Sequence, residues 1–582
     1  MISSRIWDLR RGDDEDNRTS PVGGGFRSLV LPTLLEFNYL KAPLTLAITI
    51  IIPAILVGIA PSVIITYGQL LFHTAMYARS SLIFGLLSLI VLLGIATWTG
   101  RRFLTVAFVR ARHLHYALIF PTFVTVREVL RTIGERFGGH SLSPERLWHR
   151  RRVATILAAL LFCFAGITLA LKVEVSFGLQ LVNVERVSAW ATFKAAMGNA
   201  AVVLGLSTVV ESLYWLRREL KLRNPVLNWV RRPAPADAST LRVAHLSDLH
   251  VVGDRYGCRM ETGIHGPRGN RRLRNALRRL ASIDAQAPLD HIFLTGDITD
   301  AGTRAEWTAF IDLVRQCHGL RTRLSLVPGN HDVNIVDRTN PGRLDFPWSK
   351  GPALRKLRFI LALDAIQGER TFVVDRLSSQ LGPTFSNYIR EGNRAELLHQ
   401  LAKCGTARGR LEIAKIWEGM FPLVEPPSTD RGWGLILLNS NAVSHFSLTN
   451  AIGVVDPAQM KALKAILQTS PGTAWIILLH HQVVDYPVAS IPLRDRVGLA
   501  LVNAPDLLAA VVPHASRVLV FHGHRHRDWI GTCGEVVLCS APSVTLGCEG
   551  VEDDRGSFRI HELALATGGQ IDLVATQQIA IA

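Results

Sequence analysis

The chain has 582 residues, more than one compact domain usually holds, so at least two structural units are expected. Charged residues make up only 19% of the chain and the mean hydropathy is +0.23, which excludes a disordered protein. The seven cysteines are scattered and form no Cys-x-x-Cys pair, which excludes a disulfide framework and favours a reducing compartment.

The formal net charge of +17 is unevenly distributed along the chain. Residues 1–240 hold 27 basic and 14 acidic residues, whereas residues 241–582 hold 37 and 33. A nucleic-acid-binding protein concentrates its basic residues in the folded domain, and here the second half is nearly neutral. We therefore expect no nucleic-acid partner, and we expect the two halves to have different surroundings.

Four apolar stretches lie between residues 44 and 216. They are Leu44–Ile65, Ser81–Trp98, Val153–Leu171 and Ala195–Leu216. Each is close to the ~20 residues that a helix needs to cross the hydrocarbon core of a bilayer. The pattern predicts an all-α transmembrane bundle of four spans over residues 44–216, with the lipid bilayer as its partner and with a cytosolic segment, residues 1–43, before it.

The loops between the spans alternate in basic content. One Arg or Lys lies between the first two spans, eleven lie in loop 101–152, three lie between the last two spans, and six follow the fourth span. The positive-inside rule then places both termini and loop 101–152 in the cytosol, in a multi-pass protein of the cell (inner) membrane. Within that loop, residues 117–137 predict an amphipathic helix, lying on the membrane surface or packed on the rest of the protein.

Residues 217–240 form a basic, Pro-rich linker, after which the pattern changes. Short apolar runs then alternate with helical patterns, which predicts an α/β fold over residues 241–582. The runs are 241–246, 291–294, 324–327, 434–438, 474–479 and 517–521. The helical patterns are 271–283, 304–316 and 457–467. Residues 335–432 are mostly helical in pattern and predict a helical insertion.

Polar side chains follow five of these apolar runs. They are Asp248 and His250, then Asp297, then Asn330, His331 and Asp332, then His480 and His481, and finally His522, His524 and His526. Ligands of open α/β sheets bind at the carboxyl ends of the strands. Asp, Asn and His without Cys suit borderline divalent metals such as Mn, Fe, Co or Zn.

The order of these clusters resembles the calcineurin-like metallophosphoesterase superfamily, whose pattern is D-x-H, G-D, G-N-H-[DE], H and G-H-x-H. The resemblance runs from residue 241 to about residue 565 and implies a four-layer α/β/β/α sandwich with two divalent metal ions. The implied ligands of the first ion are Asp248, His250, Asp297 and His526. Those of the second ion are Asp297, Asn330, His480 and His524.

The resemblance also assigns two further roles. His331 would face the substrate phosphate and would be oriented by Asp332. Alignment to the family favours His480 over its neighbour His481 as the ligand, and His522 is an additional histidine with a supporting or structural role. The sequence after the last motif, residues 540–550 and 556–563, resembles the class III cyclic-nucleotide phosphodiesterase branch.

These features predict a membrane-anchored phosphoesterase that hydrolyses a phosphodiester or phosphomonoester, such as a cyclic nucleotide, by metal-activated hydroxide attack. Two alternatives stay open. One is a hydrolase of phospholipids or lipid-linked pyrophosphates at the membrane face. The other is a membrane signalling or transport module whose phosphoesterase-like domain only senses. A further basic segment, from Arg271 to Arg279, predicts either a solvated helix face or a contact with anionic lipid or phosphorylated substrate.

Overall fold

A computed structural model describes most of the chain, which divides into two compact units. The helical unit comprises residues 39–221 and 488–497, and the α/β unit comprises residues 1–38, 222–487 and 498–582. The described residues are 41–78, 87, 90, 91, 94, 97, 120–136, 143–177, 188–221, 238–253, 270–336, 345, 349–376, 378–391, 407–428, 432–444, 447–486, 501–547, 556–566 and 568–581.

The helical unit contains three helices that are long and apolar enough to cross a membrane, over residues 52–74, 145–175 and 189–221. Its described elements are α3 (Lys41–Leu46), the π-helical turn η1 (Ala47–Ile51), α4 (Ile52–Ala78), α6 (Phe120–Arg136), α7 (Pro144–Phe177) and α8 (Ala189–Lys221). Helices α7 and α8 pack closely because Gly166 and Gly205 face each other. A Cβ atom at either glycine would lie 2.6 Å from the carbonyl oxygen of the other.

The sequence predicts four spans, and three are found among the described residues. The predicted second span, Ser81–Trp98, lies outside the described residues except for positions 87, 90, 91, 94 and 97. The first predicted span, Leu44–Ile65, begins in α3 and runs through η1 into α4, and the last two fall within α7 and α8.

Helix α6, which lies in the basic loop, is packed on the bundle. Phe123 is 2% exposed, and its ring contacts Phe162 of α7 and Trp215 of α8, with centroid distances of 5.3 and 4.7 Å. The buried Arg131 of α6 donates to Glu219 of α8 at 2.8 Å. Of the two alternatives for this segment, the structure has the packed helix.

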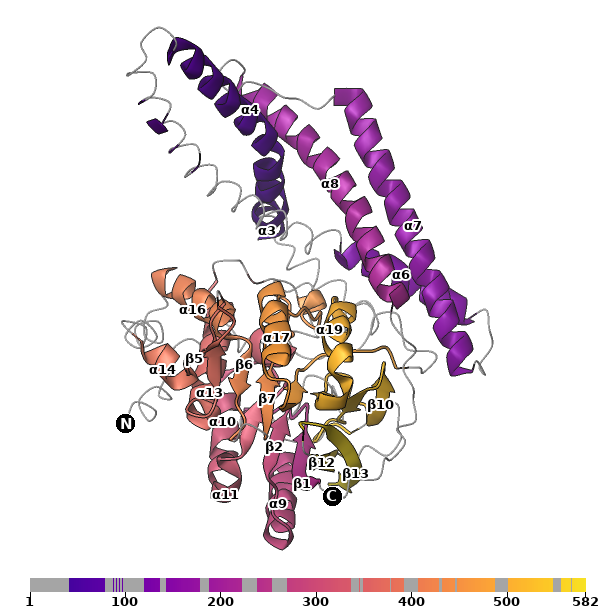
Figure 1. Ribbon diagram of the computed structural model, residues 1–582, viewed down its shortest axis with the longest axis vertical. Helices are drawn as coiled ribbons and strands as arrows, with labels where there is room; N and C mark the ends of the chain where they lie inside the picture. The colour runs from indigo at the N-terminus through magenta and orange to yellow at the C-terminus, as the bar shows by residue number, and fades with distance from the viewer. Residues whose placement is uncertain are drawn as a thin grey trace. The chain divides into compact units, whose positions relative to one another are not determined.

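The α/β unit is built on two sheets (Figure 1). The first has five strands in the order β13-β12-β1-β2-β3, and the second has eight in the order β10-β11-β9-β8-β7-β6-β4-β5. The strands are β1 (Ser239–Leu246), β2 (His291–Leu294), β3 (Leu324–Leu326), β4 (Phe372–Val374), β5 (Leu381–Thr384), β6 (Leu423–Glu425), β7 (Trp433–Leu437), β8 (Ala474–Leu478), β9 (Val518–His522), β10 (Trp529–Cys533), β11 (Val536–Ser540), β12 (Ser557–Leu565) and β13 (Ile571–Ala580).

Strands β1, β2 and β3 are mutually parallel, and so are β7, β8, β9 and β11. The described helices of this unit are α9 (Arg271–Gln286), α10 (Arg304–Arg315), α11 (His318–Arg321), α12 (Asn330–Val333), α13 (Gly351–Gln367), α14 (Phe385–Arg390), α16 (Ala407–Met420), α17 (Pro457–Thr469) and α19 (Ala504–Val511), with 3-10 turns η4 (Ser447–Thr449) and η5 (Val512–Arg517). All six predicted strands and all three predicted helical patterns are present.

Local sequence explains where several helices begin. Thr303 precedes α10 and accepts from the Glu306 backbone N–H, while Glu306 accepts from the Thr303 N–H, so that a capping box starts the helix. Asp456 caps α17 in the same position, and Pro457 follows as its first residue. These caps fix the points at which the chain leaves the loops between strands.

The core explains why the central strands are apolar throughout. Leu435 and Leu437 of β7 join a cluster that also draws residues from β1, β2 and β12, so it draws on both sheets. Ile436 of β7 points to the other face and joins a cluster with α17 and α19. Because successive side chains of a strand point to opposite faces, strands covered on both faces must be apolar at every position.

The predicted helical insertion, residues 335–432, is only partly helical. Its described part contains α13, α14 and α16, but also β4, β5 and β6, which pair in the order β7-β6-β4-β5 and widen the second sheet. These strands are three or four residues long, too short for a periodicity of two to be recognised. The described part therefore contains helices, as the pattern indicates, and in addition three strands that the sequence did not predict.

Two histidines are buried in the core of the first sheet. His245 of β1 and His561 of β12 are both fully buried, with ring centroids 5.8 Å apart, and Phe521 contacts both rings. Neither ring nitrogen of His561 has a hydrogen-bond partner among the described residues. Burial lowers the pKa of His561 to about 3, and burial together with His561 lowers the pKa of His245 well below its usual value.

The first prediction follows from this pair. Both histidines are neutral in the fold and take up protons on unfolding, so the free energy of unfolding should fall as the pH drops from about 6.5 towards about 3. His561→Leu should reduce this slope by up to about 1.4 kcal/mol per pH unit. It should not lower stability at neutral pH, because no hydrogen bond is lost. Thermal unfolding of the detergent-solubilised chain measures both effects.

The matched control is His149→Leu, since His149 is an exposed histidine of α7. The loss of pH slope should be larger in His561→Leu than in this control, because of the two side chains only that of His561 is buried without a hydrogen-bond partner among the described residues. An equal slope in the two variants would contradict the assignment of acid sensitivity to the buried pair.

Candidate metal centre

Polar side chains at the ends of five strands of the α/β unit lie close together. The strands are β1, β2, β3, β8 and β9, drawn from both sheets. All nine predicted site residues lie in the loops after these strands or in the short helix α12. Eight of them are buried, and the side chain of His526 is 18% exposed. The fold thus brings these side chains together at the carboxyl ends of the strands, where ligands of open α/β sheets bind.

The backbone of these loops adopts a conformation that most residues avoid. Outside glycine, seven described residues have a positive φ, and five of them are predicted ligands. These five are Asp248, His250, Asp297, His524 and His526. Asp and His enter the left-handed region more readily than most residues, but such positions still carry strain. Strain gathered at one cluster of polar side chains is typical of a functional site.

Two glycines allow the loops to approach each other closely. A Cβ atom at Gly329 would lie 2.1 Å from Asp297 Oδ1, and one at Gly523 would lie 1.7 Å from Ser247 Oγ. Neither position therefore has room for a side chain. The Gly-Asn-His-Asp and Gly-His-x-His motifs thus need their glycines for packing of the loops against each other.

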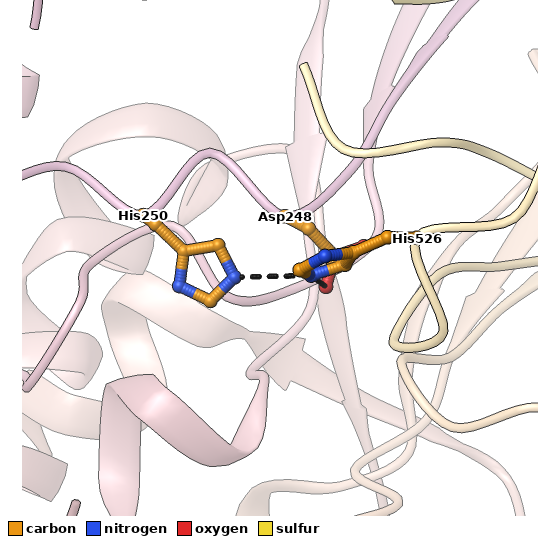
Figure 2. A group of neighbouring side chains, drawn as sticks. All are labelled: Asp248, His250 and His526. Carbon is orange, nitrogen blue, oxygen red and sulfur yellow. Dashed lines mark hydrogen bonds and ion pairs between the residues drawn. The ribbon is translucent and has the colours of Figure 1, made fainter. Parts of the chain in front are cut away.

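The first group of donors contains Asp248, His250 and His526 (Figure 2). The Nε2 atoms of His250 and His526 are 3.3 Å apart, and His526 Nε2 lies 3.4 Å from Asp248 Oδ1. Two ring nitrogens and a carboxylate oxygen therefore converge from loops far apart in the sequence. A cation between them would satisfy all three.

The second group contains Asp297, His480 and His524. His480 Nε2 lies 3.2 Å from Asp297 Oδ2, 3.0 Å from His524 Nδ1 and 3.1 Å from Asn330 Oδ1. Asp297 also forms a group with His250 and His331. It is therefore the carboxylate that lies between the donors predicted for one ion and those predicted for the other.

The hydrogen bonds of the two adjacent histidines distinguish their roles. His480 Nδ1 donates to the Thr295 carbonyl at 2.8 Å, which leaves Nε2 as the ring nitrogen whose lone pair can bind a metal ion. In His481, Nε2 donates to the Ala451 carbonyl and Nδ1 accepts from the Ser440 hydroxyl. Both ring nitrogens of His481 are thus engaged, and the structure places His480 in the donor cluster.

The charges of the cluster suit metal binding. Burial alone would raise the pKa of Asp297, but His480 and His331 hold it well below its usual range. Burial would lower the pKa of His480, but Asp297 raises it to about 9, so a cation bound here displaces a proton from this ring. Burial lowers the pKa of His524 well below its usual value, which leaves it neutral.

The donor set fits two divalent ions. In each group the donor atoms lie within 4.8 Å of one another. His524 Nε2 is buried and has no hydrogen-bond partner among the described residues. Imidazole nitrogens, carboxylates and one amide oxygen, with no thiolate among these donors, suit Mn, Fe, Co or Zn. His522 directly precedes the Gly-His-x-His motif. Its Nδ1 lies 3.4 Å from the Gly523 carbonyl oxygen, and it belongs to none of the metal-donor groups found among the described residues.

The structure changes the expected role of Asp332. Its carboxylate accepts from the backbone N–H groups of Thr299 and Gly329 and from the Thr299 hydroxyl, at 2.7 to 2.9 Å, and so joins the loops after β2 and β3. The ring of His331 is oriented instead by Asp300, because His331 Nδ1 donates to the Asp300 carbonyl at 2.7 Å. Asp332 is a positioning residue for the loops rather than for the ring.

Sequence reasoning missed two kinds of supporting residue. Asp300 Oδ1 lies 3.4 Å from His250 Nδ1, so this residue contacts a predicted ligand as well as His331. Ser543 and Thr545 donate to the carbonyls of Asp248 and Leu249 at 2.6 and 2.8 Å and hold the first loop. Asp300 stands three residues after the Gly-Asp motif, and Ser543 and Thr545 stand in the segment after the last motif, but only the fold shows what they contact.

Residues 241–528 match the family model for calcineurin-like phosphoesterases. A curated relative, described as a probable cyclic nucleotide phosphodiesterase of Coxiella burnetii, is 25% identical over 160 residues. That match covers 27% of this chain and 58% of the relative, so the chain spans less than two thirds of the relative's length.

The solved structures that match the chain include a dimetal phosphatase from Danio rerio, with 13% identity, coverage of 59% of this chain and 99% of that chain, and a TM-score of 0.33. A purple acid phosphatase from yellow lupin (Lupinus luteus) seeds has 11% identity, coverage of 60% and 55%, and a TM-score of 0.29.

The second prediction compares the adjacent histidines. His480→Gln should remove one of two bound ions, because the ring supplies Nε2 to the second group. His481→Gln should keep both ions, since its ring nitrogens bond Ser440 and Ala451. The loss of affinity in His480→Gln should exceed the roughly 10–100-fold that removal of a supporting hydrogen bond costs. Mn²⁺ titration with elemental analysis measures it, and equal loss in the two variants would contradict the assignment.

Proposed function

We propose that this protein is a membrane-anchored, dinuclear phosphodiesterase, and the match of residues 241–528 to the family model for calcineurin-like phosphoesterases supports the assignment to hydrolases of phosphoric ester bonds. The observation that carries the proposal is the position of Asp297 between two groups of metal donors. One group is completed by Asp248, His250 and His526, and the other by Asn330, His480 and His524. A domain that only sensed a ligand would not need the whole set.

Two divalent ions held here would supply Lewis acidity and lower the pKa of a water for attack on phosphorus. His331 and Asp332 have the other two roles in the proposed reaction. His331 is held by its Nδ1–H on the Asp300 carbonyl, so Nε2 is the atom at which it gives a proton to the leaving oxygen or stabilises charge there. Asp332 keeps the loops that carry Asp297 and His331 at a fixed separation.

We propose a soluble phosphodiester, such as a cyclic nucleotide, as the substrate class. The support is the relative described as a probable cyclic nucleotide phosphodiesterase and the segment that holds the first loop through Ser543 and Thr545. A second candidate is a phospholipid or lipid-linked pyrophosphate. The observation that favours it is the set of three helices able to span a membrane.

The membrane anchoring is supported by aromatic and basic residues at the ends of these helices. Trp148 stacks with Arg152 and Tyr214 with Arg218, with the cation 4.3 and 5.3 Å from the ring centroid. At the other end of α8, Trp190 pairs with Lys194. Such residues are typical of membrane interfaces. The helix between Trp190 and Tyr214 would be about 36 Å long, enough to cross a hydrocarbon core of about 30 Å.

The third prediction tests the reaction. The purified full chain with Mn²⁺ should hydrolyse bis-p-nitrophenyl phosphate and at least one cyclic nucleotide faster than a bilayer-embedded phospholipid. The variant Asp297→Ala should lose all turnover and should bind less metal. Preference for the lipid would move the assignment to the second candidate. Near-normal turnover in Asp297→Ala would contradict the dinuclear site.

The matched variant for this test is His331→Gln. It should keep both ions, because His331 is assigned to the substrate rather than to a metal. It should lose turnover most for esters with poor leaving groups, since these depend on proton transfer. Equal loss across leaving groups would contradict the proton-donating role.

The fourth prediction concerns placement in the cell. We propose that both termini and the α/β unit face the cytosol, on the basis of the eleven basic residues in loop 101–152. Reporter fusions should then find residue 75 outside and residues 130 and 400 inside. A reporter at residue 400 that is active only outside the membrane would reverse the orientation and exclude every cytosolic substrate.

A further inference from the structure

Helix α9 has one buried apolar face and one exposed basic face. The buried face is formed by Leu273, Ala276, Leu277, Leu280 and Ile283. The exposed face carries Arg271, Arg274, Arg278 and Arg279, which we call the arginine face. The helix is therefore fixed in rotation by its core contacts, and the arginine face is held towards solvent.

Within the part of the chain that the structure describes, the charge of the arginine face has no acidic partner. None of its four side chains forms an ion pair with any residue that the structure describes. The acidic residue of the helix, Asp284, is paired with Arg323 at 2.6 Å. With respect to the described residues, the face is thus a patch of positive charge without counter-charges, held on a helix with a buried side.

The positions of these arginines are unfavourable for the stability of helix α9 itself. The first turn of α9 carries basic residues and no acidic one, although the positive end of the helix dipole favours acidic residues there. Arg274 and Arg278 are four residues apart, where like charges repel. Both effects lower the stability of the helix in isolation. A polyanionic partner would offset both, because it neutralises the cations at the positive helix end.

We propose that the arginine face docks the α/β unit on the anionic lipid headgroups of the bilayer. The inference rests on the proposed membrane anchoring and is independent of the proposed substrate. The spans tether the unit near a bilayer, which raises the local concentration of headgroups around it. A flat anionic surface also matches a row of arginines on one helix face, since each basic side chain close to such a surface is attracted to it.

Docking in this way has a consequence for the metal centre. Arg272, beside the arginine face, donates to the Thr545 carbonyl at 2.8 Å, and the Thr545 hydroxyl donates to the Leu249 carbonyl. Leu249 lies between the predicted ligands Asp248 and His250. The arginine face therefore begins next to the loop of the first donor group, and docking brings this side of the metal centre to the headgroup layer.

The test uses the full chain in nanodiscs of neutral phosphatidylcholine, with or without phosphatidylglycerol. A fluorescent amino acid replaces Ser282, which is exposed four residues after Arg278, and nitroxide-labelled headgroups act as the quencher. Quenching should be at least about twofold stronger in the anionic discs, and about 0.5 M NaCl should remove the difference by screening. Equal quenching in both kinds of disc would overturn the inference.

Two variants with the same change of charge make the test specific. In the first, Arg271, Arg274, Arg278 and Arg279 are replaced by Gln, which should abolish the extra quenching. In the second, Arg315, Arg376, Lys461 and Lys464, which are exposed elsewhere on the unit, are replaced by Gln, which should preserve it. Equal loss in both variants would show attraction by net charge alone and would overturn docking through α9.

Activity in neutral discs separates the lipid from the substrate as the occupant. The first variant should keep kcat/KM for a soluble phosphodiester within about twofold, whereas a large rise in KM would assign the arginine face to the substrate and overturn the inference. Extraction of the chain by alkaline carbonate would refute the proposed anchoring instead. A chain that resists extraction but shows no lipid-dependent quenching would refute only the docking.

Discussion

The α/β unit depends on one buried carboxylate, that of Asp297. Its Oδ1 accepts from the His331 backbone N–H, its Oδ2 lies 3.2 Å from His480 Nε2, and its own carbonyl accepts from the His250 N–H. Four of the five converging strand ends therefore meet at this residue. A buried charge is tolerated only where it is paired and hydrogen-bonded, so the histidines and the loops that carry them must keep their positions.

The fold supplies those positions from both sheets. β1, β2 and β3 bring one set of donors, while β8 and β9 bring the other, and the apolar cluster that draws on both sheets fixes them against each other. The left-handed backbone conformations of Asp248, Asp297 and His524 are strained, and the packing of this core offsets the conformational free energy that the strain costs. Rigid strands with short, strained loops are what a preformed metal site requires, because the donors cannot relax apart.

The sequence predicted the parts of this arrangement that repeat a local pattern. The runs at residues 291–294 and 474–479 are buried on both faces, so they are apolar throughout and their ends are clear. β4 and β6 have three residues each, too few to show a periodicity, so the sequence of residues 335–432 predicts helices and not these strands. A strand of that length is specified by its neighbours in the sheet rather than by its own residues.

The site shows the same division. The spacing and order of the motifs predict the metal donors. They do not predict the partner of the His331 ring, which is a backbone carbonyl that only the folded loop brings near. Nor do they predict that the Asp332 carboxylate joins two loops. The choice between His480 and His481 likewise rests on which ring nitrogens are already bonded, to Thr295 in one case and to Ser440 and Ala451 in the other. Hydrogen bonds to backbone carbonyls leave no signature in a sequence.

The helical unit is held by a different kind of interaction at the end of α8. Arg131 of α6 contacts Glu128 and Glu219, and Arg152 of α7 donates to the Leu220 carbonyl. Arg131 is only 2% exposed, and a buried ion pair gains little stability, because desolvation offsets most of the attraction. Removing one partner, however, leaves an unpaired buried charge, so the pairing of Arg131 with Glu219 favours the observed packing of α6 against α8. Together with the contact from Arg152, it holds the last turns of α8 against both α6 and α7.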